Sequence, residues 1–134
     1  MLNVKKLVLS VICVMVLVSG IFGVRYLISV DKYKKTVKEL VIGSVDLSKI
    51  SDGKYIGSCD VDFVAAKVEV IVKNNKISSI ILLSHKTGKG KPAEVITQNV
   101  IEAQNLQVDA ISGATNSSKV ILKSIENALK AGES

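Results

Sequence analysis

An uncharged apolar run near the N-terminus sets the first limit on how this chain can fold. The run Leu7–Val24 reads LVLSVICVMVLVSGIFGV, eighteen residues without a charge, with two lysines before it and Arg25 after it. About 18 to 20 apolar residues are enough for a helix to cross the hydrocarbon core of a bilayer. Apolar side chains surround every face of this helix, which is not typical of a helix buried in a small soluble domain. We therefore predict that residues 1–30 form an N-terminal membrane anchor.

A cleaved signal segment is the alternative for the same residues. A signal peptide has a shorter apolar core and a small-x-small cleavage site, and Val18-Ser19-Gly20 is a weak candidate for that site. Charge alone does not settle the orientation. The lysines after the span favour a cytoplasmic C-terminal domain, whereas the short, signal-like start favours export.

A lysine-rich segment follows the apolar run. Residues 31–47 include the stretch DKYKKTVK and are expected to form a basic stalk or linker. The helix is expected to continue outward over 32–41 and to be broken by Gly43 and Ser44. Two interpretations of this segment are open: it is a solvated spacer, or its lysines are attracted to anionic lipid.

The overall charge argues against a nucleic-acid partner. The formal net charge is +6, of which the two lysines and the arginine that flank the apolar run supply three. The remaining 15 lysines are nearly balanced by 12 acidic residues. No arginine follows residue 25, and aromatic residues do not alternate with the lysines. Nucleic-acid binding is therefore not expected.

Cysteine and histidine usage gives no metal or disulfide framework. Cys13 lies inside the apolar run and Cys59 stands alone beyond it. The chain has no CxxC pair, and its single histidine, His85, has no neighbouring ligands in sequence. We expect neither an intramolecular disulfide nor a bound metal ion.

The rest of the chain, residues 48–134, predicts a small α+β domain in which an antiparallel β-hairpin or sheet packs against two helices. Residues 64–72 alternate apolar and polar side chains, which is the pattern of a half-buried strand. The stretch KNNK at 73–76 predicts a hairpin turn, and the apolar end of 77–83 predicts a return strand buried on both faces. The expected order is β-β-β-α-β-α, at residues 54–57, 64–72, 77–83, 93–104, 106–110 and 116–131.

The stretch Ser112–Ser118, SGATNSS, places small and hydroxylated residues where an extended segment enters the last helix. The first amides of a helix have no intrahelical acceptors, and the helix dipole makes them a favourable place for an anion such as phosphate. The simpler interpretation is an ordinary helix cap after a tight turn. The segment lacks the residues of a Walker A loop or of a nucleophile elbow, and no acid–base pair lies beside it in sequence.

The longer stretch VDAISGATNSS resembles the flavinylation motif of the FMN-binding domain family. That family includes the G subunit of Rnf-type complexes and the C subunit of the sodium-pumping NADH:quinone reductase. Its pattern is Asp, a small residue, any residue, Ser or Thr, Gly, Ala, Thr, any residue, then Ser or Thr. The residues from Asp109 to Ser117 match every position.

The resemblance extends upstream and covers about residues 51–130. SDGKYIG is similar to the family's opening strand, AKVEVIVKNNKISSIILLSH to its central hairpin, and VITQNVIEAQNLQ to its helix and lead-in. Larger members carry a longer Thr-Pro-Gly loop after the hairpin, where this chain has a short, lysine-rich loop. The resemblance therefore does not extend to this loop.

The resemblance implies FMN bound covalently through a phosphoester. By analogy, Thr115 is the attachment residue, and a separate FAD-dependent, magnesium-requiring flavin transferase installs the FMN. Gly113 and Ala114 would let the phosphate approach the backbone, and Asp109 would shape the turn or be read by the transferase. Hydrogen bonds to the phosphate are expected from Ser112, Asn116 and Ser117. Residues expected to line the ring are His85 and the loop 87–90, although His85 has a second reading as a solvated strand-end histidine.

In functional terms, the resemblance implies an electron-transfer domain at the outer face of the cell membrane. It would relay electrons between a membrane donor and an external or partner flavoprotein acceptor, and is more an electron carrier than a stand-alone enzyme. The alternative is a non-redox, membrane-tethered binding or scaffold domain without covalent flavin. The scarcity of aromatic residues for stacking on a flavin favours this alternative.

Overall fold

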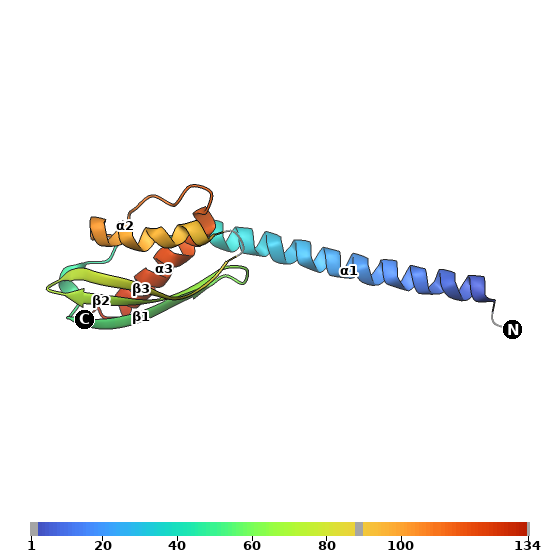
Figure 1. Cartoon of the computed structure of the whole chain (residues 1–134), viewed down its shortest axis with the longest axis horizontal. Coiled ribbons are helices and arrows are strands. Elements are labelled where there is room, and N and C mark those ends of the chain that lie inside the picture. Colours follow the sequence, from blue (N-terminus) through green and yellow to red (C-terminus); the bar gives the residue numbers. More distant parts are fainter. Residues whose placement is uncertain (1–2, 88–89, 134) are drawn as a thin grey trace. The chain divides into compact units, whose positions relative to one another are not determined.

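The computed structural model describes residues 3–87 and 90–133. The chain divides into two compact units, residues 1–35 and residues 36–134 (Figure 1). The first unit is helical from Val4 onward, and the second holds the sheet and the remaining helices. The predicted α+β class, with an N-terminal apolar helix ahead of a small mixed domain, is confirmed.

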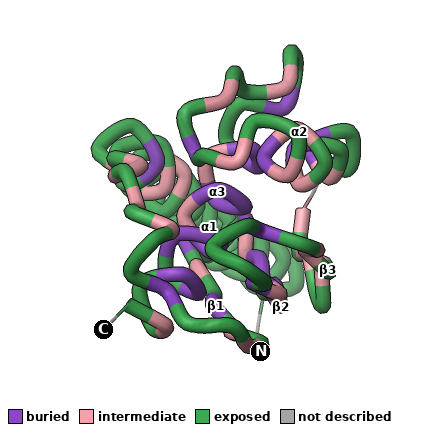
Figure 2. Tube along the Cα trace, turned by 90° about the vertical axis from the view of Figure 1, so that its left-hand side faces the viewer, coloured by how far each residue is buried: buried purple, intermediate pink, exposed green. Residues whose placement is uncertain are grey.

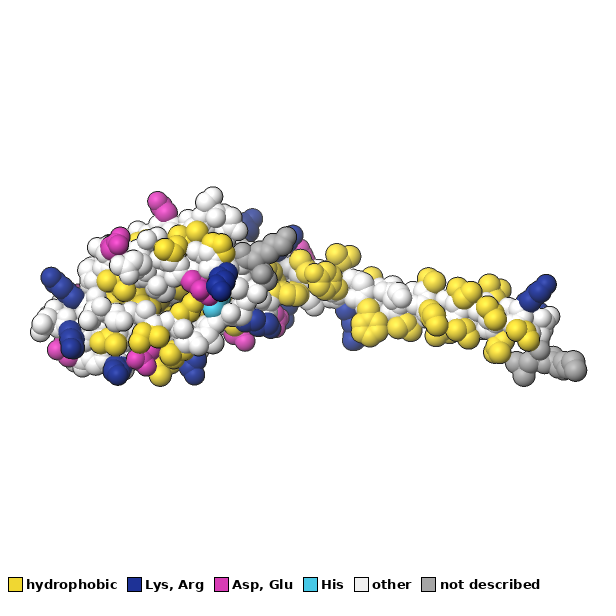
Figure 3. Space-filling view, viewed as in Figure 1, with side chains coloured by type: hydrophobic (Ala, Val, Ile, Leu, Met, Phe, Trp, Pro, Cys, Tyr) yellow, Lys and Arg dark blue, Asp and Glu magenta, His cyan; other side chains and the backbone are white. Residues whose placement is uncertain are grey.

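Helix α1 (Val4–Glu39) contains the apolar run and continues through the lysine-rich segment. It is long and apolar enough to cross a membrane, and none of its most apolar window is buried within the protein. Hydrophobic side chains cover much of its visible surface (Figure 3). These features support membrane anchoring. The helical continuation that the sequence predicts is present, but it ends at Glu39, before Gly43 is reached.

The three strands form one antiparallel sheet in the order β1 (Gly53–Asp60), β2 (Ala65–Lys73), β3 (Lys76–Lys86). The predicted hairpin turn joins β2 to β3, with Asn74 and Asn75 at φ 52° and 61°. Two successive positive φ values are the signature of a type I′ turn, whose twist matches that of the strands. Asparagine tolerates this conformation better than most residues, so the local sequence sets the register of the hairpin.

Two α-helices cover one face of this sheet. Helix α3 (Thr115–Ala131) packs across β1 and β2, and helix α2 (Ile96–Ala103) packs against β3 (Figure 1). The helix predicted over 93–104 begins later than expected, at Ile96. The 3₁₀ turn η2 (Lys91–Val95), which carries Pro92 in its first turn, takes the place of its first residues. A second 3₁₀ turn, η1 (Leu47–Lys49), precedes β1.

The core lies between the sheet and α3 (Figure 2). Val68, Val70 and Val72 alternate along β2 and are fully buried, as the period-2 pattern predicts. Helix α3 contributes Val120, Ile121, Ile125, Ala128 and Leu129, which are also buried. The helix comes so close to β1 at Gly57 that an added Cβ would meet the backbone atoms Ser124 O and Ala128 N.

Two details of the predicted sheet are wrong. Residues 106–110 form no strand but an irregular connection, because Gln104, at φ 54°, turns the chain out of α2 and binds Ile77 on β3 through its side chain. Strand β3 is not buried on both faces, since Ile81 and Leu83 are 45% and 46% exposed. The helices cover only one side of the sheet, so the apolar end of β3 leaves part of its surface in solvent.

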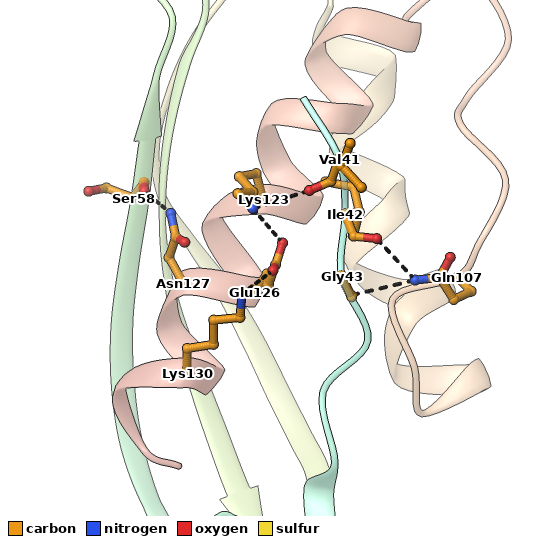
Figure 4. A network of polar contacts seen from close by, with 9 residues as sticks. All are labelled: Val41, Ile42, Gly43, Ser58, Gln107, Lys123, Glu126, Asn127 and Lys130. Carbon is orange, nitrogen blue, oxygen red and sulfur yellow. Dashed lines mark hydrogen bonds and ion pairs between the residues drawn. The ribbon is translucent and has the colours of Figure 1, made fainter. Parts of the chain in front are cut away.

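The segment after α1 is held against α3 by a buried carboxylate (Figure 4). The Glu126 side chain is 1% exposed, with Oε2 2.9 Å from Lys123 Nζ and Oε1 2.6 Å from Lys130 Nζ. Lys123 Nζ also donates to the carbonyl oxygen of Val41 at 3.1 Å. Gln107 adds two longer hydrogen bonds to the carbonyl oxygens of Ile42 and Gly43. We call Glu126, Lys123 and Lys130 the linker clamp.

The charge on Glu126 is maintained by this clamp. Burial by itself raises the pKa of the carboxyl group, but the bonds from Lys130, Lys123 and the Gly43 backbone N–H outweigh it and hold the pKa below its usual value. A carboxylate whose pKa is lower in the folded state stabilises the fold above its unfolded pKa. That stabilisation is lost as the pH falls through the folded pKa.

We expect Glu126→Gln to lower the free energy of unfolding by about 1–3 kcal/mol at neutral pH, because the two lysines and the Gly43 N–H lose a charged acceptor. Urea unfolding of the full chain in mild detergent, followed by circular dichroism, measures this change. Glu102→Gln, on the exposed side of α2, is the matched control and should change little. The difference between wild type and Glu126→Gln should shrink as the pH falls through the lowered pKa of Glu126; a difference that stays constant would contradict the assignment.

Candidate functional site

A tight turn precedes helix α3. The N–H of Ala114 donates to the carbonyl oxygen of Ile111 at 2.9 Å, which closes a four-residue turn. Gly113 is its third residue, at φ 78°, the value that a type II turn requires at this position. Nothing lies within 4 Å of where a Cβ on Gly113 would stand. The turn therefore presents open backbone to the surface, and only glycine adopts this conformation without strain.

Ser118 stabilises the turn from the buried side. Its hydroxyl group accepts from the N–H of Ile111 at 2.9 Å and donates to the carbonyl oxygen of Ala114 at 2.8 Å. The side chain is fully buried. Ser118 belongs to the hydroxyl-rich stretch that the sequence shows at the start of the last helix, and its two hydrogen bonds make it a support for the turn.

The N-terminus of α3 has no side-chain cap. Ala114 occupies the N-cap position, and no side chain there accepts a hydrogen bond from the first turn. Serine, threonine, asparagine or aspartate at this position would stabilise the helix by about 1 kcal/mol relative to alanine. The first amides of α3 are thus left available at the positive end of the helix dipole. Thr115 is the first residue of the helix and is exposed, as are Ser112 and Asn116.

The loop that follows β3 contacts the first turn of α3. Thr87 Oγ1 lies 3.1 Å from Ser117 Oγ and accepts from the N–H of Gly90 at 2.7 Å. A Cβ on Gly90 would meet both hydroxyl groups, so this position has no room for a side chain. The contact brings the end of β3 beside the helix that begins with Thr115. Gly88 and Lys89, predicted to line the flavin ring, lie outside the described residues.

His85, near the end of β3, is not the solvated histidine that one reading of the sequence allowed. Its side chain is only 2% exposed, and Nδ1 lies 3.1 Å from Glu94 Oε1 in η2. Its other ring nitrogen, Nε2, is buried and has no hydrogen-bond partner in the described part of the chain. Sequence reasoning missed Glu94, because nothing in the spacing of residues 85 and 94 indicates that a strand end and a 3₁₀ turn meet.

The predicted site residues therefore fall into two groups. Those on the surface of the turn and the start of α3 are Asp109, Ser112, Gly113, Thr115 and Asn116, all of which are exposed. Ala114, Ser117 and His85 have buried side chains and face neighbouring elements. The arrangement offers an exposed hydroxyl group, uncapped amides and little steric bulk at one point. A phosphate ester fits these features, because backbone N–H groups at a helix start stabilise its charge.

The FMN-binding domain family matches residues 64–130, half of the chain. The chain belongs to this family. FMN is accordingly the cofactor of the domain, and electron transfer is the class of function that membership supports. The match contains β2, β3, α2 and the turn before α3, and it begins after β1. No curated protein and no solved structure matches the chain.

We expect Ser118→Ala to loosen the turn of this FMN-binding domain. The Ile111 N–H, which is part-buried, would lose its acceptor at a cost of about 1 kcal/mol, and this amide should exchange its hydrogen faster. Ser112→Ala is the matched control: Ser112 is exposed, so its substitution should change the free energy of unfolding by less than about 0.5 kcal/mol. Hydrogen exchange and urea unfolding of both variants test this, and equal exchange rates at Ile111 would exclude the supporting role.

Proposed function

We propose that this chain is a membrane-anchored electron-transfer domain that carries FMN covalently, through a phosphoester to Thr115, at the outer face of the cytoplasmic membrane. The observation that carries the proposal is the exposed position of Thr115 at the uncapped start of α3, within a sequence that matches the flavinylation pattern. Membership in the FMN-binding domain family supports the cofactor. The covalent bond, the partners and the side of the membrane are the proposed parts.

Attachment is a transfer of a phosphoryl-linked group to a hydroxyl group. The Thr115 Oγ1 atom forms a bond to the flavin-side phosphorus of FAD, the pyrophosphate bond breaks, AMP leaves, and the hydroxyl proton goes to solvent. No atom is oxidised or reduced in this step. A separate magnesium-requiring flavin transferase would perform it, which agrees with the absence of an acid–base pair at Thr115 among the described residues. The open turn at Gly113 leaves room for the transferase to approach.

Once attached, the phosphodiester would lie at the start of α3. Its charge is favoured there by the uncapped amides and by the helix dipole. Ser112 and Asn116 are exposed and can donate to it, whereas Ser117 is engaged with Thr87. FMN supplies one- and two-electron redox chemistry when bound. The chain's own contribution is to tether and position it, between a membrane redox donor and an external or partner flavoprotein acceptor.

Intact mass is the first test. The full chain, co-produced with a flavin transferase, should gain the mass of FMN less one water. Thr115→Ala should abolish this gain completely, because no other hydroxyl group occupies the first position of α3, and Thr115→Ser should retain part of it. Thr97→Ala, on α2, is the control and should load like wild type. An unmodified chain beside an active transferase, verified on a known substrate, would favour the non-redox scaffold instead.

The side of the membrane can be tested by labelling single cysteines in intact cells. The native cysteines are first replaced by serine, partly because burial raises the pKa of the Cys59 thiol and makes it a poor reporter. Ser78→Cys, on an exposed position of β3, should react with a membrane-impermeant maleimide without lysis. Asn3→Cys, at the opposite end of α1, should react only after lysis. The reverse pattern would place the domain in the cytoplasm.

A further inference from the structure

The side of the sheet that α2 and α3 leave uncovered combines exposed apolar side chains with charges (Figure 1). We call it the open face and define it by Ile56, Lys67, Glu69, Ile81 and Leu83. Ile56 on β1 is 54% exposed, and the two apolar residues on β3 are nearly as exposed. The strand register places Glu69 directly between Ile56 and Ile81. Apolar side chains that gather on one exposed face are typical of an interaction surface.

The two charges at the centre of the open face lack partners. Lys67 and Glu69 lie two residues apart on the central strand β2, so both point to the same side of the sheet. Neither side chain has an ion pair or a hydrogen bond within residues 3–87 and 90–133. A surface that carries the same two charges in reverse order would match them. A second copy of the chain is such a surface, because a two-fold interface sets each residue against its counterpart's neighbour.

The register shows how two copies would match. Consider a two-fold axis that lies between two facing sheets and crosses β2 at Val68, perpendicular to the strands. The two β2 strands then run antiparallel, with Lys67 of each copy against Glu69 of the other. An axis along the strands would instead set Glu69 against Glu69, which like charges disfavour. The charge pattern therefore selects the first arrangement.

The flanking strands fit the same axis. On β1, Lys54 and Asp60 are exposed and lie at equal distances on either side of the axis, so that each would face the other residue in the second copy. On β3, Ile81 would face Leu83, the extra residue of a bulge that lies beside Lys67. One axis thus matches opposite charges on two strands and apolar side chains on the third.

A bilayer surface fits the open face less well. Lys54 and Lys67 would suit anionic headgroups. Glu69, however, lies between two isoleucines and would be carried toward the acyl chains without a cation to pair with. Removing an unpaired carboxylate from water is costly. The second copy supplies the missing cation.

The size of the open face indicates a weak contact. Three strands of about eight residues cover about 27 Å by about 14 Å, or roughly 400 Å². Stable dimers bury about 800 Å² on each partner. Pairing would therefore depend on the membrane anchor, because copies held in one bilayer meet at a high effective concentration.

We propose that the open face is a self-association surface, on which two membrane-anchored copies pair sheet to sheet with their β2 strands antiparallel. Helix α3 packs on the other side of the sheet, so pairing leaves the turn at Gly113 and the exposed Thr115 accessible. The inference goes beyond the proposed function and holds whether or not FMN is attached.

Energy transfer between copies in vesicles tests the proposal. The full chain, with both native cysteines replaced by serine, carries Ala110→Cys on the exposed connection before α3 as the labelling position. Donor- and acceptor-labelled copies are reconstituted together at a low ratio of protein to lipid. We expect energy transfer above the value that random proximity produces. Lys67→Glu and Glu69→Lys should each lower it to that value, because each sets like charges against one another.

Mixing the two variants provides the decisive comparison. With the donor on Lys67→Glu and the acceptor on Glu69→Lys, one copy presents two carboxylates and the other two ammonium groups, so energy transfer should return. This recovery also shows that neither substitution has unfolded the domain. Lys91→Glu and Glu102→Lys, at exposed positions outside the open face, are the matched controls and should leave energy transfer unchanged.

Three results would overturn the proposal. Energy transfer at the random value in the wild type means that the copies do not pair; quenching of a probe at Ser58→Cys by nitroxide-labelled lipid would then assign the open face to the bilayer. Energy transfer that neither reversal changes means that the copies meet through another surface, such as α1. An increase in Glu69→Lys would also contradict self-association through this face, because two copies with only positive charges at its centre repel each other.

Discussion

The packing of helix α3 onto the sheet is the contact on which the rest of the domain depends. The helix meets β1 backbone to backbone at Gly57, and Val120, Ile121 and Ile125 complete a core with the valines of β2. The same helix carries the uncapped turn at its start and the linker clamp at Glu126. A shift of α3 along the sheet would therefore disturb the core, the turn and the attachment of the linker together.

Alanine at the N-cap of α3 violates a local preference, and the surrounding structure compensates for it. The missing cap costs about 1 kcal/mol, while Ser118 satisfies the Ile111 N–H and binds the Ala114 carbonyl oxygen from inside the domain. Departures from local rules concentrate at functional sites. Here the departure leaves the first amides of α3 uncapped beside the exposed residue Thr115, an arrangement that supports the proposed phosphoester.

Much of the architecture could be predicted because it follows from short-range rules. Two adjacent asparagines set the β2–β3 turn, alternation identified β2, and an apolar stripe identified α3. The expected strand over 106–110 failed because short extended segments are decided by their partners, and Gln104 ties this connection to Ile77 instead. The one-sided burial of β3 could not be anticipated either, since an apolar run does not reveal how many layers cover a sheet.

The sequence by itself determined the apolar span, the hairpin and the Asp109–Ser117 pattern, which lies within the match to the FMN-binding domain family, because each depends on residues that are consecutive in the chain. The tertiary structure alone decided which of the hydroxyl and ionisable groups are available. It buries Ser117 and Ser118 and leaves Thr115 exposed. It also encloses His85 beside Glu94, a pairing that arises only when β3 and η2 come together. Burial and pairing depend on residues distant in the chain, and no local pattern encodes them.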